Sequence, residues 1–265
     1  MIRLLLICLI GPFSYTGAAW AATELEDILN IPKAAFIVEN VCEYTLYTKK
    51  ASRGFVKVRT VSMGNAGFVE PESEPHLALT AGHVLECDQE LGDRFFGDSL
   101  QKTDITSFEV KHFTTFAIYN GVRYPVNILE KGPNGLGPQD IAIISVILPK
   151  GLPHYHIPIL KDKNSYGMKS AVSIYGFMPS IDEWRLKNGK IESLSDALIK
   201  VETHVYKGLS GSILLFWDGN RHYAIGVTVG VYITPSEGYV DMAVATRLTD
   251  KVIAEIEKKA ASFNK

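Results

Sequence analysis

The chain has 265 residues, which suits one or two domains, and 46% of them are hydrophobic and 21% charged. This balance is typical of a globular protein and excludes a disordered or collagen-like chain. The formal net charge of −2 gives no electrostatic reason to expect nucleic acid or an anionic membrane surface as a partner.

The N-terminus has the pattern of a secretory signal peptide over residues 1–21. A positive charge is followed by an apolar run over Leu4–Ile10, and the small residues Ala19 and Ala21 match the cleavage rule of signal peptidases. The run is shorter than the roughly 20 residues that cross a bilayer. We expect a mature chain of 22–265, no membrane anchor, and a secreted or periplasmic location. An uncleaved anchor or a buried N-terminal helix is the alternative.

Two cysteines remain after that segment is removed, Cys42 and Cys87. An even pair in an exported chain favours one disulfide bond. Two free thiols are the alternative.

The mature chain consists of short, β-branched segments separated by turns. Residues 55–61 alternate apolar and polar side chains, as expected of a half-buried strand. Further strands are expected, in chain order, at 76–80, 114–119, 124–129, 141–147, 171–175, 200–205, 213–217, 223–231 and 241–245. Many short strands punctuated by Gly, Pro and Asn predict an antiparallel all-β sandwich or barrel.

One helix is expected, at the C-terminus over 249–262. Thr249 suits the N-cap position, and Asp250 favours the positive end of the helix dipole. The apolar stripe of an amphipathic helix is formed by Val252, Ile253 and Ile256.

Three short motifs carry residues suited to nucleophilic catalysis. His83 follows a strand that ends in small residues, Asp140 precedes an apolar strand, and Ser210 stands among glycines. A serine nucleophile needs a nearby base, a histidine accepts a proton near neutral pH, and a carboxylate fixes the histidine tautomer. The amides of Gly208 and Ser210 are the expected oxyanion donors. Each motif alone is also compatible with an ordinary turn or loop.

The three motifs together resemble those of chymotrypsin/trypsin-like serine peptidases. Leu79–Val84 is similar to the histidine motif, Asp140–Ile144 to the aspartate motif, and Gly208–Ser212 to the serine motif. The Gly-x-Ser-Gly-Ser form is most similar to the bacterial glutamyl-endopeptidase-like branch.

This resemblance covers the chain from about residue 35 to the end. It implies two antiparallel Greek-key β-barrels followed by the C-terminal helix, with barrels at about 33–150 and 157–248. It further implies a serine endopeptidase that acts on protein or peptide substrates and needs no cofactor. A disulfide bracing the histidine loop is implied for Cys42 and Cys87, and it would stabilise the fold by very roughly 4 kcal/mol. A catalytically idle binding or adhesin-like module on the same scaffold is the competing function.

Departures from the family pattern concern activation and specificity. Leu209 stands where the animal enzymes carry an aspartate that pairs with a freed N-terminal amine, so activation by that pair is not expected. The resemblance places His204 at the base of the primary pocket and Thr228, Val229 and Gly230 along the substrate edge. An acidic or polar P1 residue is therefore expected rather than Lys or Arg. The alternative is that His204 lies on a partly exposed strand.

The remaining histidines are interpreted as structural residues. His154 and His156 put two imidazoles on one face of an extended segment, as at the start of a metal site. No third ligand has a convincing spacing and prolines flank the pair, so a solvated loop and no metal site are expected. His76, His112 and His222 are expected to be ordinary strand or turn residues.

Overall fold

Strands dominate the computed structural model, which describes residues 26–87, 104–132, 139–203, 208–233 and 241–263. The expected signal peptide, residues 1–21, lies outside the described residues. Among the described residues, no helix is long and apolar enough to span a membrane.

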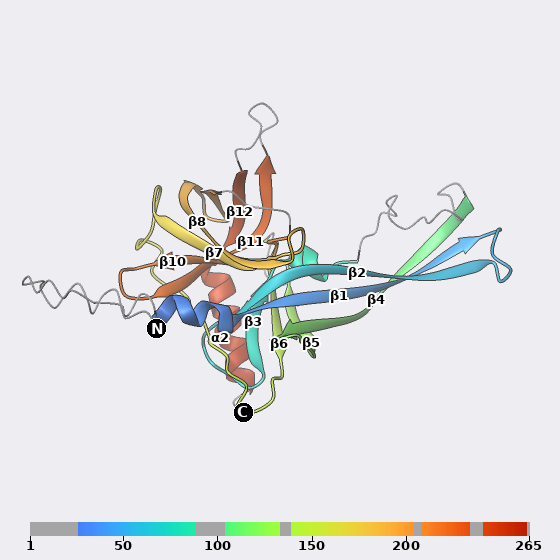
Figure 1. Ribbon diagram of the computed structural model, residues 1–265, viewed down its shortest axis with the longest axis horizontal. Helices are drawn as coiled ribbons and strands as arrows, with labels where there is room; N and C mark the ends of the chain where they lie inside the picture. The colour runs from blue at the N-terminus through green and yellow to red at the C-terminus, as the bar shows by residue number, and fades with distance from the viewer. Residues whose placement is uncertain (1–25, 88–103, 133–138, 204–207, 234–240, 264–265) are drawn as a thin grey trace, which may run out of the picture.

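Six antiparallel strands close the first barrel in the order β1-β2-β3-β6-β5-β4 (Figure 1). The strands are β1 (Ala35–Thr48), β2 (Phe55–Phe68), β3 (His76–Thr80), β4 (Ile105–Tyr119), β5 (Val122–Lys131) and β6 (Ala142–Val146). Both β3 and β6 are buried along their whole length, so the apolar runs of their sequences fill the barrel interior.

The second barrel repeats this topology in the order β7-β8-β9-β12-β11-β10. Its strands are β7 (Ala171–Met178), β8 (Glu183–Leu194), β9 (Leu198–Glu202), β10 (Ile213–Trp217), β11 (His222–Ile233) and β12 (Asp241–Arg247). The expected all-β fold of two antiparallel barrels with a C-terminal helix is confirmed.

Helix α2 (Asp250–Phe263) follows the second barrel and packs in a hydrophobic core that contains residues of both barrels, most of them from the first. Val252, Ile253 and Ile256 are buried in that core, as the apolar stripe predicts. Thr249 caps the helix, because its hydroxyl accepts a hydrogen bond from the amide of Val252 at 3.5 Å. Residues 26–34 form a helical segment at the other end of the described chain, and Ile31 within it is buried in the same core.

The strands β1, β2 and β4 are much longer than β3 and β6, and Figure 1 shows them extending together beyond the barrel as an arm. The burial of β2 changes along its length, since residues 55–63 are exposed or half-buried and residues 64–68 are buried. A separate small core forms in the arm around Cys42, Tyr44 and Leu46. The arm was not expected from the sequence, which shows its strands only as short segments.

Candidate active site

His83 and Asp140 are brought together from two different parts of the first barrel. His83 lies in the short 3-10 helix η1 (Gly82–Leu85), which follows β3, and Asp140 precedes β6. The Nδ1 atom of His83 is 2.6 Å from Oδ2 of Asp140, and the His83 amide donates a hydrogen bond of 2.8 Å to Oδ1. Because β3 and β6 are paired in the sheet, their ends bring these two residues into contact.

Solvent reaches this pair more than expected, since the side chains of His83 and Asp140 are 42% and 38% exposed. The hydrogen bond to Asp140 raises the pKa of His83 above its usual value, against the opposing effect of burial. Burial acts to raise the pKa of Asp140, but hydrogen bonds from the His83 ring and amide outweigh it and hold that pKa below its usual value. Each partner therefore stabilises the charged form of the other.

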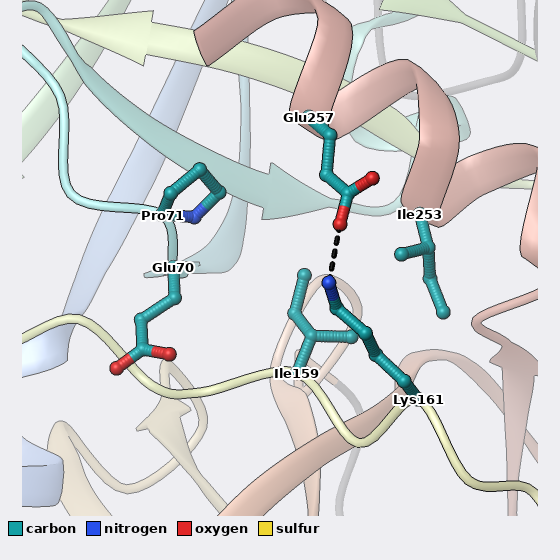
Figure 2. A pocket seen from close by; sticks show the side chains of 6 residues that line it. All are labelled: Glu70, Pro71, Ile159, Lys161, Ile253 and Glu257. Atoms are coloured by element: carbon teal, nitrogen blue, oxygen red, sulfur yellow. Dashed lines mark hydrogen bonds and ion pairs between the residues drawn. The ribbon is translucent and has the colours of Figure 1, made fainter. Parts of the chain in front are cut away.

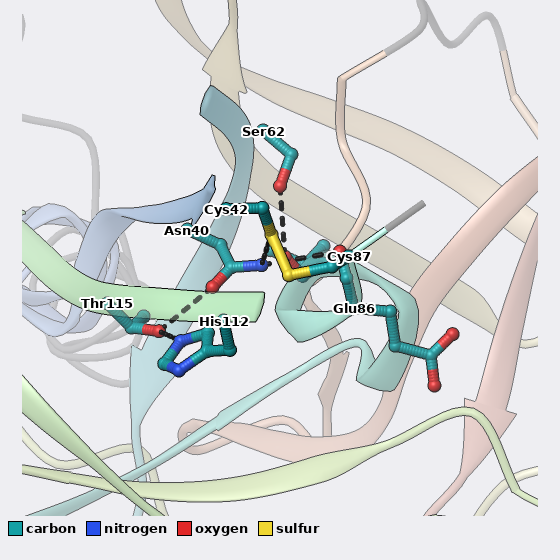
Figure 3. The surroundings of a disulfide bond; sticks show 8 residues. Asn40, Cys42, Ser62, Glu86, Cys87, His112 and Thr115 are labelled. Atoms are coloured by element: carbon teal, nitrogen blue, oxygen red, sulfur yellow. Dashed lines mark hydrogen bonds between the residues drawn. A yellow bond between two sulfur atoms is a disulfide. The ribbon is translucent and has the colours of Figure 1, made fainter. Parts of the chain in front are cut away.

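The turn that carries His83 is fixed on its far side by the first barrel and by a disulfide (Figure 3). Ser62 donates a hydrogen bond to the carbonyl of Val84, and buried Asn40 donates one to the carbonyl of Glu86. Cys87 follows directly and forms a disulfide with Cys42 of β1, which confirms the expected bond. These links leave η1 little freedom to move relative to Asp140.

The Asn40 side chain is itself held by a short chain of hydrogen bonds. Its Oδ1 atom accepts a bond of 3.0 Å from the hydroxyl of Thr115, and Nε2 of His112 lies 2.8 Å from that hydroxyl. His112 is thus a structural residue on β4, as expected.

The loop before β10 carries Ser210 between two glycines in the left-handed region. Gly208 has φ of +107° and Gly211 has φ of +90°, which non-glycine residues rarely adopt. A Cβ atom on Gly211 would lie 1.8 Å from the carbonyl oxygen of Asn65, and one on Gly208 would lie 2.4 Å from Pro179. Both glycines are therefore required by close packing as well as by their backbone angles.

Asn65 of β2 ties this loop to the first barrel, and the sequence gives no signal for it. Its amide donates a hydrogen bond of 2.7 Å to the carbonyl of Ser210. Its side chain donates to the carbonyls of Gly208 and Phe177 at 2.7 and 3.1 Å, and accepts from the Phe177 amide at 2.7 Å. One buried asparagine thus joins the Ser210 loop to both barrels.

Ser210 comes close to the His83 turn but is not hydrogen-bonded to it. A Cβ atom on Gly64 would lie 2.9 Å from the Ser210 carbonyl oxygen and 2.5 Å from the Val84 side chain, so the two segments face each other across Gly64. The contacts among the described residues include no hydrogen bond between the Ser210 hydroxyl and the His83 ring. Such bonds are often long in enzymes without substrate.

The two backbone amides expected to bind the oxyanion are not used in hydrogen bonds to other described residues. The amides of Gly208 and Ser210 donate to no described acceptor, whereas the next two amides do: Gly211 donates to the carbonyl of Thr228 and Ser212 to that of Leu209.

Leu209 is 1% exposed and packs in the core of the second barrel. The position that holds an aspartate in animal enzymes therefore contributes to packing here. Its methyl group approaches Gly176, on which a Cβ atom would lie 2.8 Å away.

The residues expected to determine specificity differ in how far they are accessible to a substrate. His204 lies outside the described residues. The side chain of Thr228 is 1% exposed, so it is not available to a substrate, while Val229 and Gly230 are half-buried. The register of β11 against β12 shifts between Thr228 and Gly230, and β10 pairs with β11 only as far as Val227.

Comparison with known proteins supports the fold but gives no sequence relative. Neither a scan against protein-family models nor a search of curated proteins found a match. Among solved structures, the chain is similar to the HtrA-type protease AlgW in a structure with a decapeptide. The TM-score is 0.56 at 14% identity, covering 93% of this chain and 68% of that one. The chain has the trypsin-like fold.

This likeness shows the trypsin-like fold of the chain. It does not support the narrower glutamyl-endopeptidase-like branch, because the similar structure is an HtrA-type protease. At this identity the comparison concerns the scaffold alone.

A second His–Asp pair joins the N-terminal helical segment to β11. Asp27 Oδ2 lies 2.6 Å from Nδ1 of His222 and accepts a bond of 2.6 Å from the His222 amide. Both side chains are about nine-tenths buried, and Tyr155 donates to the other carboxylate oxygen at 3.3 Å. The likeness to His83–Asp140 is only geometric, because this buried pair anchors residues 26–34 to the second barrel.

The expectation of a solvated loop at His154 and His156 is wrong. His156 is 7% exposed, and the two residues cluster with His76 of β3, which is 4% exposed. Burial, together with the neighbouring His76 and His154, lowers the pKa of His156 to about 4. Burial also lowers the pKa of His76. The third histidine of the cluster, His76, lies on a strand far from His154 in the sequence. The spacing of residues in the sequence therefore gave no sign of it.

A pocket of about 140 Å³ lies where α2 meets residues 157–161 (Figure 2). An ion pair of 2.5 Å between Lys161 and Glu257 crosses it, with Glu70, Pro71, Ile159 and Ile253 around it. It contains none of the residues of the candidate active site.

Proposed function

We propose that the protein is a serine endopeptidase whose triad is His83, Asp140 and Ser210. The observation that carries the proposal is the bonded His83–Asp140 pair on a trypsin-like scaffold, with the glycine-flanked Ser210 loop held against the same barrel by Asn65. A serine in such a loop gains nucleophilicity only when a base and its orienting group are within reach.

The mechanism follows from the orientation of the histidine ring. Because Nδ1 of His83 donates to Asp140, Nε2 is the nitrogen that takes the proton of the Ser210 hydroxyl as that oxygen attacks the peptide carbonyl. The imidazolium formed is stabilised by the Asp140 carboxylate, which already raises the His83 pKa. The amides of Gly208 and Ser210, which donate to no other described residue, stabilise the oxyanion, each typically worth about 3 kcal/mol of barrier. Proton return to the leaving amine gives the acyl-enzyme, and water then hydrolyses it.

The substrate is proposed to be an extended peptide that pairs with β11. Beyond Val227 this strand is not covered by β10, so backbone groups at Val229 and Gly230 are available for β-augmentation. The solved structure of AlgW with a decapeptide is consistent with a peptide ligand on this fold. An acidic or polar P1 residue, read by His204, remains our proposal for specificity.

The cellular setting is proposed from the N-terminus and the disulfide. We propose that residues 1–21 are a cleaved signal peptide and that 22–265 is the peptidase, secreted or periplasmic. The disulfide between Cys42 and Cys87 fits an oxidising compartment. The reaction needs no metal or organic cofactor, since proton transfer and nucleophilic attack are supplied by side chains.

The test is hydrolysis of an unfolded protein and of a peptide library by the wild type, Ser210→Ala and Ser212→Ala. The Ser212 hydroxyl is buried and without a partner among the described residues, so its removal is a matched control. Turnover should fall by about 10⁶-fold in Ser210→Ala and stay near wild type in Ser212→Ala. Equal turnover in wild type and Ser210→Ala would overturn the proposal.

A binding module without turnover is the second candidate, and the lack of a hydrogen bond between Ser210 and His83 favours it. In that case the wild type and Ser210→Ala would bind the same peptides with equal affinity, and neither would cleave them.

A further inference from the structure

Three histidines from two segments that are far apart in the sequence meet in one cluster. His76 is the first residue of β3, and His154 and His156 lie in the segment between the barrels. One ring nitrogen from each residue lies within 4.8 Å of the other two. The ring centroids of His76 and His154 are 4.2 Å apart, and His156 is 5.2 and 5.1 Å from them.

Two of these rings have a buried nitrogen without a partner. Nδ1 of His76 and Nε2 of His156 are inaccessible to solvent and form no hydrogen bond among the described residues. A neutral imidazole has a lone pair on one nitrogen, and this lone pair is what a metal ion binds. A buried polar atom with no partner is a cost that folded proteins seldom keep without a function.

The third ring is set in the matching tautomer. Nδ1 of His154 lies 2.8 Å from the carbonyl oxygen of Leu152, so this nitrogen carries the proton and donates it. Nε2 of His154 is then the lone-pair nitrogen. Metal-bound histidines commonly have their other ring nitrogen oriented in this way by a backbone carbonyl.

The surroundings are rigid and apolar on one side and acidic on the other. Phe68 is fully buried, and its ring centroid lies 5.8–6.3 Å from the centroids of all three histidine rings. The residue after His156, Ile157, is hydrogen-bonded to Phe68 and Glu70 at the end of β2. The exposed Glu72 carboxylate lies 3.7 Å from Nε2 of His154.

We propose that His76, His154 and His156 bind a divalent transition-metal ion, Zn²⁺ in preference to others, with Glu72 as the fourth ligand. Imidazole and carboxylate ligands suit zinc. In a tetrahedral zinc site, neighbouring ligand nitrogens are about 3.3 Å apart at zinc–nitrogen distances near 2.0–2.1 Å. Since the three nitrogens already lie within 4.8 Å of one another, the ion would draw any pair together by no more than about 1.5 Å.

The role of the ion is structural. It joins β3, which leads to the His83 turn, to the segment between the barrels. No residue of the proposed triad belongs to the site, so the inference does not depend on the proposed function.

The test is metal analysis of the full chain, expressed without a histidine tag, loaded with Zn²⁺ and dialysed. The comparison variants are His154→Gln, which changes the least buried of the three histidines, and two controls. His112→Gln removes a histidine outside the cluster, and His83→Gln removes the exposed His–Asp pair, the main competing place for zinc. We expect about one ion per chain in the wild type and both controls, and none in His154→Gln.

Two further readouts keep the test decisive. Co²⁺ in place of Zn²⁺ should give the strong visible absorption of a tetrahedral site in the wild type and lose it in His154→Gln. Free Zn²⁺ at about 100 times Kd should raise the Tm by about 5–10 °C in the wild type and not in His154→Gln. Glu72→Gln should weaken zinc binding by about 10–100-fold. The proposal is overturned if the wild type retains no zinc, or if His154→Gln retains as much as the wild type.

Discussion

The two histidine sites of the first barrel are built in opposite ways. His83 is half exposed, and its ring and amide are both bonded to one carboxylate, so its pKa is raised. His76 and His156 are buried and their pKa values are lowered, and each has a ring nitrogen with no partner in the part of the chain that the structure describes. The first arrangement suits a group that gains and loses a proton during each turnover. The second keeps imidazole neutral and its lone pair available to a metal ion.

The difference teaches that the number and spacing of histidines do not indicate their function. The group that each ring nitrogen contacts must also be known. The same residue type is used three times in paired or clustered form, since His222 with Asp27 is a further buried anchor. Which groups surround each ring decides between catalysis, metal binding and structural support. The predictions that follow test this contrast, from the largest expected effect to the smallest.

Asp140→Asn should lower kcat by about 10⁴-fold, because the amide no longer holds His83 in the required tautomer. Neutral His83 is the active base, so activity falls as pH drops below its raised pKa. Without the carboxylate that pKa falls, and the acid limb of kcat/KM should move to lower pH. The measurement is a pH–rate profile.

Glu86→Gln is the matched control, because Glu86 raises the His83 pKa only through its charge. It should keep nearly full activity with a slight downward shift of the acid limb. A similar loss of activity in both variants would show that charge near His83, rather than the Asp140 bond, is what matters.

Replacing both cysteines, Cys42→Ser with Cys87→Ser, should lower the free energy of unfolding by about 4 kcal/mol, given the sequence separation of 45 residues. Urea unfolding measures this loss. The change frees the His83 turn, so peptidase activity should fall, while zinc binding at the three histidines stays at the wild-type level. Loss of both together would mean that the two sites are not independent.

Lowering the pH should destabilise the protein through His156. Its pKa is about 4 when folded and near 6.5 when unfolded, so the unfolded state binds the extra proton first. This stability is complete above pH 6.5 and is lost as pH falls toward 4, by about 3 kcal/mol for the metal-free chain. His83 has the opposite sign, since its raised pKa adds stability below pH 6.5 that is lost at higher pH.

The measurement is urea unfolding of the metal-free wild type and His156→Leu between pH 4 and 7. The variant should show a flatter decline on acidification. An equal slope in both proteins would remove His156 as the cause.

Asn65→Ala should lower the free energy of unfolding by about 1–3 kcal/mol, because it leaves partly buried backbone groups of Gly208 and Phe177 without the side chain that bonds them. It should also lower kcat by up to about 10²-fold, since the Ser210 loop is no longer held in place. Asn40→Ala provides a comparison, because the Asn40 side chain also makes three hydrogen bonds, two of them buried. It should cost similar stability and less activity; the reverse ranking would contradict the role given to Asn65.

Much of the fold was predictable because its strands are short and strongly patterned. The expected bounds of β3 and β10 agree with the structure, and the C-terminal helix differs by one residue at each end. The repeat of one topology in both barrels was not predictable, because it is carried by the order of strand pairing and not by similar sequence. The arm was also missed, since the exposed part of β2 has no periodicity that tells a projecting ribbon from a barrel strand.

The residues proposed to take part in the chemistry could be predicted from the sequence. The residues that hold them in place could not. His83, Asp140 and Ser210 stand in recognisable local motifs, and the structure brings the first two into contact. Asn65 and Asn40 act through contacts made far along the chain, and nothing near them in sequence indicates this. His76 was missed as a partner of His154 for the same reason, because the two rings meet only through a tertiary contact between β3 and the segment that joins the barrels.

The most direct test of the account is labelling with a fluorophosphonate probe across pH, with the modified residue located by mass spectrometry. The account predicts a single adduct on Ser210, formed at a rate that rises through a pKa above 6.5. Labelling should be almost abolished in His83→Gln and unchanged in Ser212→Ala. No adduct on Ser210 in the wild type, or an equal rate of labelling in His83→Gln, would contradict it.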